Sequence, residues 1–432
     1  MRRQLLLLVG LTARLTAQLD PSELLLRVRE KVLHTVDQLP RYMCTQTIDR
    51  SQYEPDRSVF VKDCQELEFS RDKRWKLLRT TSDRLRLDVG VAARREIYSW
   101  VGENQFENRS LFKIVTDGSM STGNFQGFLD LVFRSDKADF SYAEETTEEG
   151  RKLTKYRYRV PQDASHYVFR AGAQALTTAY EGTILADPET ADLVRLVVRT
   201  SHLPAETGTC EATTTMNYQR FRLNSSGFLL PSETHLQIKD LNGVESENRT
   251  VYSGCHEFLG ESTLTFTAPP DGSAEKGAAP HAEMTIPAGL RFGLALAQDI
   301  HVATAAAGET VKAVLTTDLR DQAKKVLVPN NTPVQCRILR LRRYYRDQKR
   351  VELLLHLEDY LLPSGRRAVV AKLDTPIPDV RRRRRETLPS PQVTLGPLNA
   401  MGQNQWFARF ARVADDYVIK SGLASNWVTV AQ

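Results

Sequence analysis

The sequence predicts a mainly β protein with few helices, an α+β fold arranged as two domains. Most of the chain consists of short runs in which apolar and polar residues alternate between turn residues, the pattern of antiparallel strands joined by hairpins. One amphipathic segment precedes these strands, and a Pro- and Gly-containing linker at 266–282 divides them. We therefore expect a large curved antiparallel half-barrel over 19–265, packed on an N-terminal helix, and a small β-barrel-like domain over 283–432.

The amphipathic segment is predicted to be a helix over 22–39. Ser22 can cap its start, and Pro40 ends it. Its apolar positions recur at helical spacing: Leu25, Val28, Val32 and Val36. This periodicity gives the helix one face that can pack on the sheet.

Strands are expected along most of the remaining chain. In the front domain the pattern predicts strands at 42–50, 59–69, 74–80, 84–90, 95–101, 151–160, 166–170, 179–186, 193–200, 213–223, 228–239 and 246–258. Two short helices are expected near 111–115 and 125–133, around a glycine-rich turn. In the back domain we expect strands at 291–298, 310–317, 325–328, 333–343, 350–358, 367–373 and 418–430, interrupted by an arginine-rich insertion at about 376–400.

Residues 1–18 have the layout of a secretory signal peptide. Arg2 and Arg3 precede an apolar run that begins at Leu5, and Ala17 supplies a small residue near the expected cleavage point. The run is too short to span a bilayer, and no later apolar run approaches the ~20 residues that a spanning helix needs. We expect export to the periplasm or the extracellular space, including the periphery of the outer membrane, without a transmembrane span.

Four of the five cysteines are disulfide candidates in such a compartment. We expect local pairs, Cys44 with Cys64 across a hairpin and Cys210 with Cys255 across the meander, although spacing alone leaves the connectivity open. Cys336 is left over in an apolar segment and is predicted to be a buried free thiol. No spacing among the cysteines and histidines fits a zinc site.

The front domain resembles the lipoprotein-carrier (Lol-type) fold of bacterial envelope proteins. The resemblance lies in the N-terminal helix, the uninterrupted meander, the mid-chain helices, and the turn Ala186 to Thr190 before the strand at 193–200. It implies a half-open barrel around a cavity that takes acyl chains. These disulfides and the second domain are departures from a simple carrier.

The back domain resembles the small β-domain of periplasmic scaffold proteins of conjugation and type IV secretion systems. The residues that carry this resemblance lie at 286–289, 307–311, 327–330 and 417–422. It implies a compact barrel suited to docking on another envelope component.

Aromatic and apolar residues of the front domain are candidates for a cavity or its lid. They pack either as a filled core against the helix or as the lining of an apolar cavity. The candidates are Phe125, Phe128, Leu129, Phe133, Tyr156, Tyr158, Tyr180 and Tyr218.

The charge is uneven along the chain, whose formal net charge is +6. Residues 281–432 hold 23 basic and 14 acidic residues, so the part between the leader and residue 280 is net acidic. A basic back domain can be a solvated surface or can face an anionic partner. The candidate docking residues are Arg340, Arg342, Arg343, Arg346, Arg381, Arg382 and Arg383.

No catalytic, cofactor or metal site is predicted. No G-x-S-x-G, P-loop or H-E-x-x-H motif is present. A serine hydrolase is a remote alternative, raised by Ser110 with Lys113 and by Lys420, which follow the order of β-lactamase motifs at the wrong spacing. The sequence therefore favours a non-enzymatic envelope protein that binds a lipid or lipoprotein, with a structural subunit docking through the back domain as the alternative. Nucleic acid is not an expected partner.

Overall fold

A computed structural model gives the structure of this chain. It describes residues 20–257 except 93, 104–105, 107–109, 173, 202 and 224–225, together with 286–374, 392–395 and 402–431. The predicted leader and linker lie outside these residues, as do Arg381, Arg382 and Arg383. The leader, the linker and the division into two domains therefore stay predictions. The described residues up to 257 are called the front part, and those from 286 the back part.

The helices of the described residues lie in the front part. They are α1 (Pro21–Gln38), α2 (Cys64–Arg74), α3 (Leu111–Ile114), α4 (Gly127–Phe133) and the short 3-10 helices η1 (Gln162–Ala164) and η2 (Ala205–Thr207). α1 begins one residue before the predicted start, because Asp20 rather than Ser22 is the cap. The Asp20 side chain accepts a hydrogen bond from Ser22 N at 2.8 Å.

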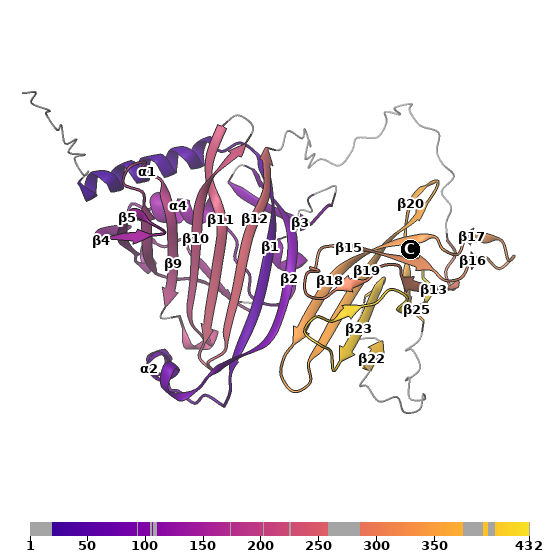
Figure 1. Ribbon diagram of the computed structural model, residues 1–432. Coiled ribbons are helices and arrows are strands. Elements are labelled where there is room, and N and C mark those ends of the chain that lie inside the picture. The colour runs from indigo at the N-terminus through magenta and orange to yellow at the C-terminus, as the bar shows by residue number, and fades with distance from the viewer. Residues whose placement is uncertain are drawn as a thin grey trace, which may run out of the picture.

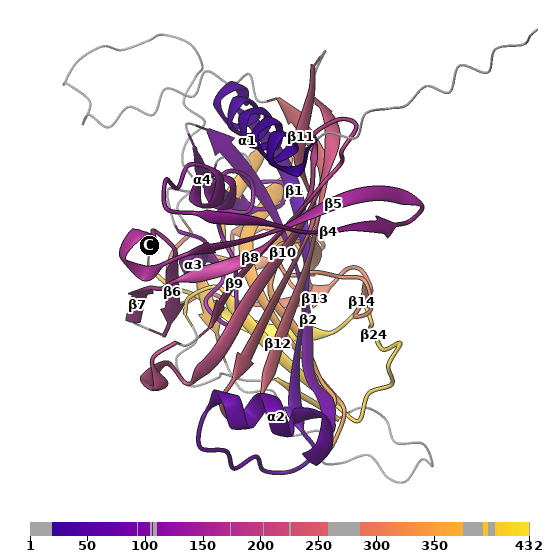
Figure 2. The same ribbon diagram turned by 90° about the vertical axis from the view of Figure 1, so that its left-hand side faces the viewer.

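The front strands form one antiparallel sheet in the order β4-β5-β8-β9-β10-β11-β12-β1-β2-β3, with β6 and β7 as a separate hairpin. They are β1 (Tyr42–Pro55), β2 (Leu77–Ala92), β3 (Arg95–Trp100), β4 (Asp139–Glu148), β5 (Arg151–Val160), β6 (Val168–Ala171), β7 (Gln174–Thr177), β8 (Tyr180–Ala186), β9 (Leu193–Ser201), β10 (Thr209–Leu223), β11 (Ser226–Asp240) and β12 (Glu245–Glu257). α1 lies across one end of this sheet and α2 lies at the opposite end (Figure 1). Helices α1, α3 and α4 and the β6–β7 hairpin lie on one side of the sheet (Figure 2).

The back part is made of shorter strands. They are β13 (Arg291–Leu296), β14 (Ile300–His301), β15 (Thr310–Leu315), β16 (Leu319–Arg320), β17 (Val326–Val328), β18 (Pro333–Tyr344), β19 (Arg350–Leu362), β20 (Gly365–Ala368), β21 (Ala371–Leu373), β22 (Gln392–Leu395), β23 (Gln405–Ala411), β24 (Val418–Ile419) and β25 (Ala424–Thr429). Their core holds the buried rings of Trp406, Phe410 and Trp427. Strand β23, which carries Trp406 and Phe410, is absent from the sequence prediction.

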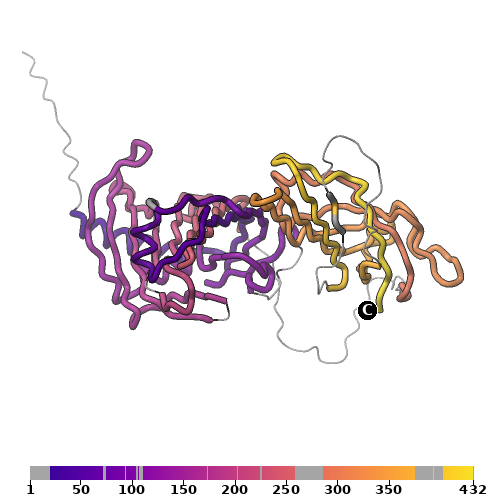
Figure 3. Tube along the Cα trace, turned by 90° about the horizontal axis from the view of Figure 1, so that it is seen from below, coloured from indigo at the N-terminus to yellow at the C-terminus, as the bar shows by residue number. Residues whose placement is uncertain are grey.

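The two parts share one 19-stranded sheet. Strand β18 of the back part pairs with β2 of the front part, placing Arg342 opposite Asp83. Hydrogen bonds from Arg86 N to Ala307 O at 2.7 Å and from Tyr345 N to Thr80 O at 2.9 Å extend this contact. Seen from below, the front and back parts lie side by side (Figure 3).

The predicted mainly β fold with a large antiparallel sheet is confirmed. The strand predicted at 59–69 is wrong, because this segment turns into helix α2. The Asp63 side chain accepts from Glu66 N at 2.8 Å, and the Glu66 side chain accepts from Lys62 N at 2.9 Å. This pair of reciprocal caps starts the helix. The strands predicted at 74–80 and 84–90 are one continuous strand, β2.

The four candidate cysteines form two disulfides, but the expected local pairing is wrong. Cys44 is bonded to Cys255, and Cys64 is bonded to Cys210. Strand β1 pairs with the last front strand, β12, so Cys44 lies beside Cys255, and α2 carries Cys64 to the start of β10. The bonds close separations of 211 and 146 residues, and loops of that length correspond to about 5 kcal/mol each in the chain-entropy model. Two such bonds fit an oxidising compartment.

Candidate ligand-binding cavity

One end of the concave face of the front sheet is filled by side chains. The core there joins α1 and α4 to the sheet through Leu24, Val28, Val32, Val36, Phe128, Leu129, Val132, Phe133, Tyr156, Tyr158, Tyr180, Met216 and Tyr218. The hydroxyl groups of Tyr156, Tyr158 and Tyr180 donate to backbone carbonyls at 2.6, 2.7 and 2.6 Å. Their apolar rings and satisfied hydroxyls make this end a packed core.

Side-chain size falls along the inner face of β10, away from that core. Successive inward residues are Tyr218, Met216, Thr214 and Ala212, and all four are buried. Alternate residues of a strand face the same side of the sheet, so the large residues meet α1 and α4 whereas the small ones leave space. The sheet is therefore hollow beyond the end of the helices.

A cavity of about 980 Å³ occupies this hollow and is called the front cavity. Its floor includes Ala212, Leu236 and Ile238 of β10 and β11, and Phe169 of the β6–β7 hairpin closes one side. Most of the segment 110–123, called the roof segment, lies over it and contributes Leu111, Phe112, Val115 and Met120. The volume lies near the upper end of the about 300–1,000 Å³ typical of ligand sites, and the floor is apolar.

A second hollow of about 690 Å³ adjoins the front cavity. The two share Ser119, Phe169, Arg170, Gly172 and Ile238 in their walls. The shared residues place the two hollows next to each other.

Glu96 of β3 fastens the far end of the roof segment. Its carboxylate accepts hydrogen bonds from Gly123 N at 2.7 Å, from Phe125 N at 3.0 Å, and from the Tyr98 hydroxyl. Burial and the neighbouring Glu96 charge raise the pKa of Tyr98, so its hydroxyl stays a donor. These contacts fix the chain between the roof segment and α4.

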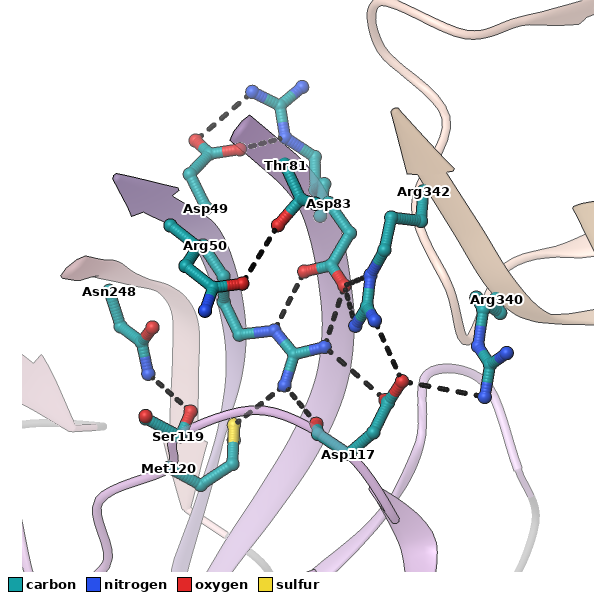
Figure 4. Close-up of polar contacts among 12 residues, drawn as sticks. Asp49, Arg50, Thr81, Asp83, Asp117, Ser119, Met120, Asn248, Arg340 and Arg342 are labelled. Carbon is teal, nitrogen blue, oxygen red and sulfur yellow. Dashed lines mark hydrogen bonds and ion pairs between the residues drawn. The ribbon is translucent and has the colours of Figure 1, made fainter. Parts of the chain in front are cut away.

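Arg50 of β1 fastens the middle of the roof segment (Figure 4). Its guanidinium makes two hydrogen bonds of 2.7 Å to the Asp83 carboxylate and donates to Asp117 O at 2.6 Å. Arg342 of β18 also donates to Asp83 at 2.8 Å, and it pairs with the Asp117 carboxylate at 3.0 Å. The roof segment, β2 and the back part therefore meet in one ionic cluster, here called the Asp83 cluster.

The charged form of Asp83 is favoured within this cluster. Burial alone would raise the pKa of Asp83, but the hydrogen bonds and charges of Arg50 and Arg342 outweigh it and hold the pKa below its ordinary value. The side chains of Asp83 and Arg50 are only 6% and 8% exposed. Removing Asp83 would leave the partly exposed Asp117 as the remaining carboxylate of the cluster for Arg50 and Arg342.

A second cavity of about 620 Å³ lies between the front and back parts. Lys113, Ile114, Val115, Thr116 and Asp117 line it from the roof segment, so this segment forms a wall common to both cavities. Its other walls carry paired charges, such as Arg337 with Glu358 at 2.5 Å. Burial lowers the pKa of His356 in the same wall, which favours its neutral form. The charges in the walls of this junction cavity are paired with one another, whereas the front cavity combines apolar residues on its floor with charged residues at its border.

The structure corrects most of the predicted cavity lining. Of the eight candidates only Phe128 borders the front cavity, and seven of the eight belong to the packed core with α1 and α4. Phe125 packs instead against Tyr42 and Tyr252, with ring centroids 5.7 and 4.8 Å away. The prediction looked for the cavity where side chains are large, whereas the space lies where they are small. The falling side-chain size along β10 is the signal in the sequence that marks it.

The structure also corrects the predicted external basic face. Arg342 pairs with Asp83 and Asp117, and Arg340 pairs with Asp117 at 3.4 Å. Arg343 donates to Val302 O at 2.6 Å, and Arg346 pairs with Glu54 at 2.8 Å. These arginines therefore have partners within the chain, and three of the four join the back part to the front part.

The remaining chemical candidates are placed without forming a reactive site. Cys336 is a buried free thiol, and burial raises its pKa to about 12. Ser110 borders the front cavity, whereas Lys420 pairs with Asp299 in the back part at 2.8 Å. Within the described ranges no group of His, Cys, Asp and Glu side chains could hold a metal ion. Among those residues no helix has both the length and the apolar character needed to cross a membrane.

Neither a protein-family model nor a curated protein matches this sequence. Several solved structures match part of the chain. A LolA superfamily protein from Nitrosomonas europaea matches with 11% identity and a TM-score of 0.24, covering 56% of this chain and 94% of its own. A putative outer membrane lipoprotein-sorting protein domain from Vibrio parahaemolyticus matches with 10% identity and a TM-score of 0.26, covering 53% and 90%. The lipoprotein LppX of Mycobacterium tuberculosis matches with 10% identity and a TM-score of 0.20, covering 56% and 99%. The function proposed below therefore rests on the residues of the cavity itself.

Proposed function

We propose that this chain is an exported, non-enzymatic binding protein that takes an apolar or amphipathic ligand, a lipid or the acyl chain of a lipoprotein, into the front cavity. The observation that carries this proposal is a hollow of about 980 Å³ with Leu236, Ile238 and Phe169 in its lining, beside a packed core on the same sheet. Burial of acyl methylene groups against Leu236, Ile238 and Phe169 would supply the binding energy, at about 0.8 kcal/mol for each buried methylene.

The roof segment suits a binding role because it is fastened by polar contacts over an apolar floor. Asn248 donates to Ser119 O at 2.6 Å, and Glu96 and Arg50 hold the segment on either side. The alternative of a structural subunit docking through the basic back part has less support. Four of its seven candidate arginines have partners within the chain.

Gly127 offers a direct test, because it borders the front cavity and a Cβ added there meets no heavy atom within 4 Å. Gly127→Phe should place a ring in the cavity without disturbing the fold. Gly227→Phe is the matched control, since Gly227 has equal space around its Cβ but does not border the cavity.

Binding of the fluorescent acyl chain cis-parinaric acid to the full chain would be measured by titration. We expect saturable binding by the parent protein, about ten-fold weaker binding by Gly127→Phe, and unchanged binding by Gly227→Phe. Absence of saturable binding, or equal affinities for the parent and Gly127→Phe, would overturn the proposal.

A further inference from the structure

We infer that the ligand of the front cavity carries an anionic headgroup, received by Arg95 and Arg170 at the rim. This inference rests on the proposed function and goes one step further, to the chemical class of the ligand. It follows from the charges that border the cavity and from which of them already have partners.

Five charged residues border the front cavity: Arg94, Arg95, Glu96, Asp117 and Arg170. Arg94 pairs with Asp37, Glu96 holds the backbone after the roof segment, and Asp117 belongs to the Asp83 cluster. These three charged side chains therefore have partners within the protein.

Arg95 and Arg170 differ from the other three. Their side chains are exposed, and neither forms an ion pair or hydrogen bond with another described residue. Among the described residues, the two charges of the cavity wall that have no partner are therefore both positive. A guanidinium group binds carboxylate or phosphate through two parallel hydrogen bonds. The guanidinium groups of Arg95 and Arg170 are therefore suited to binding an anion.

The two arginines stand on different elements that border the cavity. Arg95 begins β3, and Arg170 lies in β6, where it also borders the adjoining hollow. The floor between these elements consists of buried or half-buried apolar residues such as Leu236 and Ile238. Exposed positive charge above an apolar floor matches a molecule with one apolar chain and one anionic end.

Gln126 provides an independent sign of a polar ligand group. It borders the cavity, it is only 5% exposed, and its Oε1 has no hydrogen-bond partner among the described residues. A buried acceptor without a partner costs free energy, which a donor on the ligand would recover. A hydroxyl group between the chain and the headgroup of an amphiphile would serve as that donor.

Three probes with the same myristoyl chain separate the headgroup from the chain. They are lysophosphatidylglycerol, which is anionic, lysophosphatidylcholine, which is zwitterionic, and monomyristoylglycerol, which is neutral. Each would be titrated calorimetrically into the delipidated full chain below its critical micelle concentration. The variants are Arg95→Gln with Arg170→Gln, and the control Arg157→Gln, which removes an exposed arginine that does not border the cavity.

We expect the parent protein to bind the anionic probe about ten-fold more tightly than the neutral one. The double variant should lose most of this preference, about three-fold for each arginine, while its affinity for the neutral probe stays unchanged. Arg157→Gln should retain the full preference. Urea unfolding midpoints equal to that of the parent would show that the variants are folded.

The outcomes distinguish the inference from the proposal beneath it. Equal affinity of the parent protein for all three probes, or an undiminished preference in the double variant, would overturn the headgroup inference. Neither result would contradict the proposed binding of an acyl chain in the front cavity. Binding of none of the probes would overturn the proposed function and the inference together.

Discussion

Replacing Asp83 by Asn tests how the front and back parts are joined. The substitution keeps the size of the side chain but removes the charge that Arg50 and Arg342 share. Both guanidinium groups would then keep only a neutral amide and the partly exposed Asp117 carboxylate, which lies 3.0 Å from Arg342 and 3.7 Å from Arg50. Breaking a buried ion pair in this way costs about 3–5 kcal/mol, a large part of the about 5–15 kcal/mol that stabilises a typical domain.

Asp49→Asn is the matched control, since Asp49 lies in the same pair of strands and binds Arg84 at 2.6 Å. Asp49 is 52% exposed, so water replaces its lost ion pair and the expected cost is at most about 1 kcal/mol. Figure 4 shows Asp49 and Asp83 close to each other on these two strands. The two variants therefore each remove a carboxylate that pairs with arginine, and they differ in how deeply that carboxylate is buried.

The assay is urea unfolding of the full chain with both disulfides intact, followed by circular dichroism. Because the pKa of Asp83 is held below its ordinary value of 3.8, its contribution is present above about pH 4 and is lost as pH falls through the folded-state pKa. The difference between the parent protein and Asp83→Asn should shrink accordingly in acid. Equal costs for Asp83→Asn and Asp49→Asn at neutral pH would refute the reasoning.

Three further predictions concern the fold. Gly118→Ala should cost more stability than Gly150→Ala. The backbone φ is similar at the two sites, +78° and +80°, but only at Gly118 would an added Cβ meet the Arg50 Nη1, at 2.6 Å. Equal losses of stability in a thermal melt would contradict this prediction. The Cys336 thiol, with its pKa raised to about 12 by burial, should resist iodoacetamide at pH 8 until urea is added, and rapid labelling of the native protein would contradict its burial. Peptide mapping without reduction should recover the two long-range disulfides described above, and recovery of local pairs would show that β1 does not lie beside β12.

The sequence was sufficient for the elements that depend on local patterns. The helix predicted at 22–39 and the strands predicted at 228–239 and 246–258 follow from periodicity, which acts over a few residues. Helix α2 could also have been predicted, because Asp63 and Glu66 have the spacing of a capping box. The apolar and polar residues at 59–69 alternate, and this alternation led to the prediction of a strand in place of the helix.

The disulfide connectivity and the cavity depend on contacts between distant segments. Pairing of β1 with β12 brings together residues that are about two hundred positions apart, and no local pattern records it. The basic residues of β18 resemble a solvent-exposed face in sequence, but Asp83 and Asp117 of the front part pair with Arg342 and Arg340. The cavity could have been located from the falling side-chain size between Tyr218 and Ala212, once that face of β10 is known to point inward.

Photo-crosslinking of a ligand is the measurement that tests the central claim most directly. A myristic acid with a diazirine near the end of its chain would be bound to the delipidated full chain, irradiated, and located by peptide mapping. We predict adducts on the roof segment 110–123, on Phe169, and on Leu236 or Ile238, with none on the outward-facing residues of β10. Adducts confined to the outer face of the sheet or to the back part would contradict the account.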